Sequence, residues 1–367
     1  MRSDRVQRMM TREEINGILL FDPFNIRYLT GYKPVSVGGS SVAVLAPDVE
    51  PWLIVPQEEY ELAKVNSWFR NVLSYSHQKK EGIQSPFLGC IHDAIDQHNL
   101  QAVDIGIELD FVSARRFEEL KRLLPDAGFK NITVPMNELR MVKDDIEIEK
   151  IQSAVQTAEN GLLAALEFIQ PGISEIEVAA EVERTLRRAG ATNTGYPTVI
   201  ASGNRATYPY VPASRREIGA DELVVISISA INDDYCSKVT RTIVTGKPNK
   251  KQHAMFKCAL DAVSAAQNQL NPETHVRDIA LSIRRIAEQK GYLEVLNQQM
   301  GNGVGLQPHE PPHVSTSNES PLLPGMVFTI ETGFFDPSIG GVHLGNMVLC
   351  QKDGVYTTLN QISLDLI

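Results

Sequence analysis

The 367-residue chain is longer than one hydrophobic core usually supports, so its length predicts two domains. Hydrophobic residues make up 43% of the sequence and charged residues 22%, which are globular values and exclude a disordered chain. The formal net charge of −10 and the pI near 5.4 argue against nucleic acid or an anionic membrane as the main partner.

The first part of the chain alternates short strand-like and helix-like segments. Apolar runs predict strands at residues 17–21, 41–46, 49–56 and 103–109. An amphipathic segment with a basic C-terminal end predicts a helix over residues 113–124. Together these segments predict an α/β domain over residues 1–138.

From residue 139 onward the pattern changes. Helical spacing of apolar residues predicts two pairs of helices, at residues 145–169 and 175–190 and again at residues 251–270 and 276–292. Strand-like segments follow each pair, at residues 196–203 and 223–244 and later at residues 326–333 and 347–351. This order indicates a duplicated unit within a second domain over residues 139–367.

The segment LVVISISAINDDYCSKVTRTIV, residues 223–244, predicts two strands joined by a polar turn. Because successive side chains of a strand alternate between its faces, Ser227 and Ser229 share one face of the first strand. Lys238 and Thr240 share one face of the second strand. A hairpin with a polar face on each strand is expected to line a site rather than fill a core.

The spacing of the cysteines and the length of the apolar runs indicate the cellular compartment of the protein. The four cysteines are scattered without paired spacing, which predicts neither a disulfide framework nor a zinc knuckle and fits a reducing environment. The first residues are charged and lack an apolar signal core, and no run approaches about 18 apolar residues. We therefore expect a cytoplasmic protein without a membrane span.

Several blocks of the sequence, taken in order, resemble the creatinase, aminopeptidase P and prolidase family. They are LRMVKDDIEIEKIQSA, YPTVIASGNRATYPYVP, LVVISISAINDDYCSKVTRTIVTGKP, GNGVGLQPHEPP, LLPGMVFTIETG and GGVHLGNMVL. The resemblance covers nearly the whole chain. It implies an α/β (α+β) fold, with a creatinase-like N-terminal α/β domain over residues 1–138 and a C-terminal pita-bread domain over residues 139–367.

Most members of that family are peptidases with two divalent metals held by two aspartates, one histidine and two glutamates. Carried over position by position, the resemblance retains only Glu331 of these five ligands. The other four positions hold Ser227, Lys238, Asn302 and Gly345. Serine and asparagine are weak ligands and an ammonium repels a cation, so we expect no metal and no other cofactor.

The resemblance also implies a site for a small-molecule substrate or ligand around these positions. His309 and Glu331 are the remaining acid–base pair, and Lys238 is the third catalytic candidate. Lys238 could instead only neutralise Glu331, and the acid–base pair could be retained by descent alone. The candidates for substrate binding are Tyr210, Ser227, Asn302, His313 and His343.

Three functions are weighed for this site. The favoured one is a metal-independent hydrolase of a C–N bond in a small nitrogenous metabolite, since creatinase is the metal-free hydrolase of this family. The alternative is a catalytically inactive member that binds a ligand or a protein, and the least favoured is an Xaa-Pro metallopeptidase. Relatives of this architecture are commonly homodimers, so the resemblance also implies a homodimer.

Overall fold

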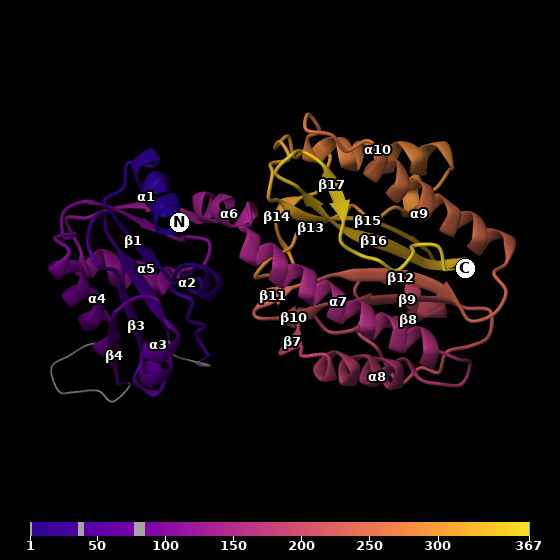
Figure 1. Cartoon of the computed structure of the whole chain (residues 1–367), viewed down its shortest axis with the longest axis horizontal. Coiled ribbons are helices and arrows are strands. Elements are labelled where there is room, and N and C mark those ends of the chain that lie inside the picture. Colours follow the sequence, from indigo (N-terminus) through magenta and orange to yellow (C-terminus); the bar gives the residue numbers. More distant parts are fainter. Residues whose placement is uncertain (1, 36–39, 77–84, 367) are drawn as a thin grey trace. The chain divides into compact units, whose positions relative to one another are not determined.

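The computed structural model describes residues 2–35, 40–76 and 85–366. The chain divides into two compact units, Met1–Arg140 and Met141–Ile367 (Figure 1). Both units mix helices with sheets, which confirms the α/β fold class predicted from the sequence. No helix among the described residues is long and apolar enough to cross a membrane.

In the first unit, six strands of the described residues form one mixed sheet in the order β4-β3-β2-β1-β5-β6. The strands are β1 (Gly17–Leu20), β2 (Val42–Leu45), β3 (Trp52–Pro56), β4 (Asn71–Tyr75), β5 (Asp104–Ile107) and β6 (Gly128–Asn131). The helices are α1 (Arg2–Arg12), α2 (Pro23–Thr30), α3 (Tyr60–Asn66), α4 (Pro86–Gln97), α5 (Ala114–Leu123) and α6 (Thr133–Met141). The strands and the helix predicted from the apolar runs are therefore confirmed.

The second unit is built on an eight-stranded sheet of the described residues, in the order β14-β13-β15-β16-β12-β9-β8 with β17 paired to β16. These strands are β8 (Val199–Ser202), β9 (Leu223–Ile228), β12 (Val239–Val244), β13 (Asn302–Gly303), β14 (Glu310–His313), β15 (Val327–Asp336), β16 (Gly340–Cys350) and β17 (Tyr356–Thr358). A small sheet adds β7 (Asn193–Thr194), β10 (Ala230–Asn232) and β11 (Tyr235–Cys236).

Four helices cover the large sheet in two pairs. They are α7 (Asp145–Phe168), α8 (Glu175–Arg188), α9 (Lys250–Asn268) and α10 (Val276–Gln289). The pair α7 and α8 packs on β8, β9 and β12, and the pair α9 and α10 packs on β15 and β16 (Figure 1). Each pair thus has its own apolar core, in agreement with the duplicated unit indicated by the sequence.

The segment 223–244 departs from the single hairpin predicted for it. The strands β9 and β12 pair antiparallel, with Ser227 opposite Thr240. Between them the chain leaves the large sheet, and β10 pairs with β7 and β11 instead. The polar face of the hairpin nevertheless lies where the alternation of strand side chains predicts it.

The alternation of strand side chains sorts the large sheet into two faces. In β9, Ile226 packs into the core under α7 and α8, and Ser227 therefore points to the opposite face. In β15, Ile330 packs under α9 and α10, and Glu331 points to the opposite face. The same rule places His343 of β16 on that polar face, which gathers side chains from distant parts of the chain.

Arg241 of β12 is fully buried and stabilises the end of the chain against this sheet. Its guanidinium donates hydrogen bonds to the carbonyl oxygens of Gly345, Ile362 and Ser363 and to Oδ1 of Asn346. Burial lowers its pKa to about 10, so the group stays charged at neutral pH. Arg241 therefore has a structural role.

Candidate functional site

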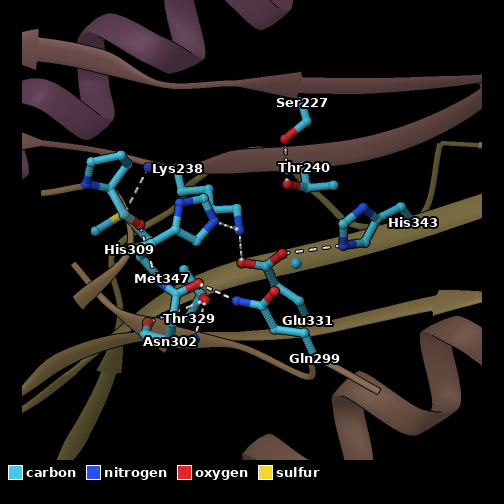
Figure 2. A network of polar contacts seen from close by, with 12 residues as sticks. Ser227, Lys238, Thr240, Gln299, Asn302, His309, Thr329, Glu331, His343 and Met347 are labelled. Carbon is cyan, nitrogen blue, oxygen red and sulfur yellow. Dashed lines mark hydrogen bonds and ion pairs between the residues drawn. The ribbon is translucent and has the colours of Figure 1, made fainter. Parts of the chain in front are cut away.

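A buried ion pair lies at the centre of the polar face. The ammonium Nζ of Lys238 lies 2.7 Å from Oε1 of Glu331, and each side chain is no more than 3% exposed (Figure 2). The contact is an ion pair rather than a well-aligned hydrogen bond. Because each charge has lost its hydration, each depends on the other for compensation.

The second oxygen of Glu331 contacts a buried histidine. Nε2 of His343 lies 3.1 Å from Oε2 of Glu331 (Figure 2). Burial by itself would raise the pKa of Glu331, but Lys238 and His343 outweigh that effect and hold the pKa well below its ordinary value. Glu331 is therefore a carboxylate whose two oxygens are both in use.

Gly345 provides the room in which Glu331 lies. The two residues are opposite each other in the β15–β16 ladder. A Cβ atom at position 345 would lie 2.5 Å from Cγ of Glu331, which is closer than such atoms approach in proteins. Any side chain at position 345 would therefore displace Glu331 from its present position.

His309 contacts Lys238 from the other side. Its Nε2 lies 3.4 Å from Nζ of Lys238 (Figure 2). An ammonium group can only donate, so Nε2 accepts and the proton of the neutral imidazole lies on Nδ1. Partial burial and the nearby Lys238 lower the pKa of His309 to about 4. His309 is accordingly neutral at pH 7.

Two tyrosine rings flank the ammonium of Lys238. Nζ lies 6.0 Å from the ring centroid of Tyr196 and 5.9 Å from that of Tyr210, at the outer limit of a cation–π contact. Tyr210 has a positive φ of 59°, which is rare for an aromatic residue and marks a turn held by its surroundings. The two rings and His309 therefore separate the ion pair from solvent.

A pocket of about 440 Å³ opens in front of these rings. It is lined by Tyr196, Pro197, Val199, Tyr210, Gln299 and His309. Its size lies within the range of small-molecule sites, and its lining is mostly aromatic and apolar with a few polar groups. The sequence prediction included Tyr210 and His309 but missed Tyr196 and Gln299, although Tyr196 begins one of the quoted blocks.

Ser227 and Asn302 lie behind the pocket wall and support it. Oγ of Ser227 is 2.9 Å from the hydroxyl of Tyr196 and 3.0 Å from Oγ1 of Thr240. Nδ2 of Asn302 donates to the carbonyl oxygen of Pro308, directly before His309. Both side chains thus hold residues that line the pocket, and neither lines it itself.

The remaining predicted residues divide into two groups. His343 is buried next to Glu331, with its ring 6.1 Å from that of Tyr210 between centroids. His313 is exposed on β14 and is not part of the pocket lining. The fold therefore brings Lys238, Glu331, His309, His343 and Tyr210 together and leaves His313 outside the cluster.

The donor atoms of this cluster do not resemble a metal centre. Within the described part of the chain, no group of three or more His, Cys, Asp and Glu side chains could hold a metal ion. The positions assigned to ligands by the family resemblance present two neutral side chains, one ammonium and one glycine beside Glu331. These are poor partners for a divalent cation.

Known proteins resemble this chain along nearly its full length. Residues 2–142 match the Creatinase/Prolidase N-terminal domain, and residues 149–352 match Metallopeptidase family M24. The Xaa-Pro dipeptidase of Pyrococcus horikoshii is 32% identical over 350 residues, which are 95% of this chain and 94% of that protein. The Xaa-Pro dipeptidase of Pyrococcus furiosus is 32% identical over 353 residues, 96% of each chain.

The three-dimensional fold also resembles that of a solved structure. The crystal structure of the prolidase from Pyrococcus horikoshii superimposes with a TM-score of 0.89 at 31% sequence identity, and the match covers 100% of this chain and 99% of that chain. The expected creatinase-like N-terminal domain and pita-bread domain are therefore confirmed.

These similarities correct the function expected from the sequence. A metal-independent, creatinase-like C–N hydrolase is wrong as the favoured function, because full-length relatives are Xaa-Pro dipeptidases in a metallopeptidase family. The Xaa-Pro class, which the sequence ranks last, is the one that the relatives support. The error has a physical cause: the identity of five ligand positions says little about which molecule the pocket accommodates.

Removing one charge of the buried pair should be costly, and removing both should be tolerated better. We expect Lys238→Met to lower the free energy of unfolding by about 3–5 kcal/mol, because Glu331 then stays buried without its counter-charge. In the double variant Lys238→Met with Glu331→Gln, the free energy of unfolding should fall by clearly less. Urea denaturation of the three proteins measures this difference. Equal losses in the single and double variants would show that the two charges do not compensate each other.

Histidine titration tests the state of His309. We expect its NMR titration midpoint near pH 4, with the Nδ1–H tautomer above that pH. The folded pKa lies below the unfolded value of about 6.5, so this group stabilises the fold above pH 6.5 and loses that contribution as the pH falls towards 4. In the neutral double variant the midpoint should rise. A midpoint near 6.5 in the wild-type protein would contradict the contact with Lys238.

Proposed function

Because the chain belongs to metallopeptidase family M24, with the creatinase/prolidase N-terminal domain preceding it, we propose that its pocket binds short peptides of the Xaa-Pro class. The full-length similarity to two Xaa-Pro dipeptidases supports this class of ligand. The pocket of about 440 Å³ is large enough for a peptide of two residues.

The lining of the pocket suits a proline ring. Tyr196, Pro197, Val199 and Tyr210 present flat aromatic and apolar surfaces. A pyrrolidine ring placed against them buries apolar surface, and each Å² buried contributes about 25 cal/mol of favourable free energy. It also brings no N–H group of its own when its nitrogen is acylated, so the apolar wall leaves no ligand donor unsatisfied.

The observation that supports the next part of the proposal is the ion pair between Lys238 and Glu331. We propose that this pair replaces the family's metal pair and that the metal ligands are lost. An ammonium about 4 Å from a divalent ion is repelled by about 8 kcal/mol at an effective dielectric of about 20. Glu331, the single family ligand retained, already uses both oxygens for Lys238 and His343.

This donor set supports recognition without two-metal hydrolysis as the proposed function. In this proposal the chain is a pseudo-metallopeptidase: it binds the Xaa-Pro class but does not activate water through metals. The side chains of the cluster then have binding and structural roles. His309 contacts the ligand, Lys238 sets the proton position on His309, and Ser227 and Asn302 support the wall.

Cleavage of Xaa-Pro dipeptides is the second candidate function. The similarity to proteins of that name over 95% or more of this chain favours it. The homodimer, the cytoplasmic location and the roles of the individual site residues stay predictions.

Metal content and peptide binding test the proposal together. We expect the protein purified without chelator to hold less than about 0.1 equivalents of manganese, cobalt or zinc by mass spectrometry, since the site offers a metal no adequate donor set. In EDTA, free or N-acetylated Gly-Pro should bind more tightly by calorimetry than the Gly-Ala peptide with the same end group. Proton NMR of the same peptides with added manganese should show no turnover.

A matched variant restores the family's ligands. It combines Ser227→Asp, Lys238→Asp, Asn302→His and Gly345→Glu, and the last change should displace Glu331 from the position it now occupies. We expect this variant to retain about two equivalents of manganese. Turnover of Gly-Pro by the wild-type protein that needs manganese would establish the dipeptidase instead. Equal affinity for proline and alanine peptides would overturn the proposed ligand class.

A further inference from the structure

The pocket wall carries no formal charge. Its six lining residues are two tyrosines, a proline, a valine, a glutamine and a histidine. The contact with Lys238 fixes that histidine, His309, in the neutral form. A charged group on a ligand would therefore find no opposite charge on this wall.

The nearest carboxylate cannot serve a ligand. Glu331 is 2% exposed, and its two oxygens lie 2.7 Å from Lys238 and 3.1 Å from His343. An ammonium group entering the pocket would have to displace one of these partners and would meet the charge of Lys238 behind the wall. Both effects oppose a free α-ammonium, the group at the start of an unmodified peptide.

The tautomer of His309 favours an acceptor on the ligand. Nε2 of His309 accepts from Lys238, so Nδ1 carries the proton and can only donate. None of the described residues pairs with Nδ1. The hydroxyl of Tyr196 is in contact with Ser227. A ligand oxygen is the partner that this donor can use.

The amide of Gln299 and the two tyrosine rings have neighbours within the site. Oε1 of Gln299 lies 3.5 Å from the hydroxyl of Tyr210, and its Nε2 lies 3.5 Å from Asn302. The rings of Tyr196 and Tyr210 both lie at about 6 Å from the ammonium of Lys238. A second cation at these rings would be repelled by the first.

We propose that the pocket selects peptides whose amino end is acylated, so that an uncharged acyl carbonyl rather than a free α-ammonium lies against His309. This inference rests on the proposed Xaa-Pro class and adds the chemistry of the end group. The ligand is then an N-acyl Xaa-Pro peptide, which presents an acceptor to Nδ1 and no positive charge to Lys238.

Binding of a matched pair of peptides tests the end group. In calorimetry with EDTA at pH 7, the dissociation constant of N-acetyl-Gly-Pro should be at least about tenfold lower than that of Gly-Pro. Raising the pH through about 8 deprotonates the α-amine, so the affinity for Gly-Pro should rise while that for the acetylated peptide stays constant. Equal or tighter binding of Gly-Pro at pH 7 overturns the inference and leaves the Xaa-Pro class intact. Binding of neither peptide overturns both.

A charge-neutral variant separates electrostatics from shape. In Lys238→Met with Glu331→Gln the ammonium and the carboxylate both disappear, and His309 regains the freedom to accept a hydrogen bond. The preference for the acetylated peptide should then fall to about twofold or less. A tenfold preference that persists in this folded variant would assign it to the shape of the pocket and overturn the electrostatic argument. A circular dichroism spectrum unchanged from the wild type serves as the folding control.

Discussion

The buried ion pair between Lys238 and Glu331 is the constraint on which the rest of the site depends. Both side chains are no more than 3% exposed, so each charge must be compensated by its partner. His343 lies against the second carboxylate oxygen, and the ammonium makes Nε2 of His309 an acceptor. It also needs the space above Gly345, where a side chain would displace Glu331. Lys238 therefore determines which nitrogen of His309 accepts a hydrogen bond, and it holds the carboxylate of Glu331.

The large sheet of the second unit makes this cluster possible. Its apolar face packs under two pairs of helices, and the alternation of strand side chains forces the intervening residues to the other face. The family resemblance assigns its metal-ligand positions to that face. In this chain the face presents an ammonium, a carboxylate and neutral hydrogen-bonding groups. The site is polar and compact, and the chemistry that we propose for it is recognition of uncharged acceptors rather than cation binding.

Features that depend on neighbouring residues could be predicted from local patterns in the sequence, whereas features that depend on contacts between distant segments could not. Four strands and one helix of the first unit, and the four long helices of the second, follow from local periodicity. The meeting of Lys238 with Glu331 follows from the family resemblance. The tyrosine Tyr196 and the amide of Gln299 were missed, because pocket walls are assembled from loops that no periodic pattern marks. The favoured function was wrong for a related reason: ligand positions alone do not determine which molecule the wall accommodates.

The sequence by itself determined the two-domain α/β architecture and the family, because these depend on local pattern and on residue identity. The tertiary structure decided where each candidate site residue lies relative to the pocket. Ser227 and Asn302 became supports behind it, His313 stayed outside the cluster, and Lys238 became the partner of Glu331. The physical reason is that charge compensation and hydrogen bonding act through space, between residues more than 90 positions apart in the case of Lys238 and Glu331.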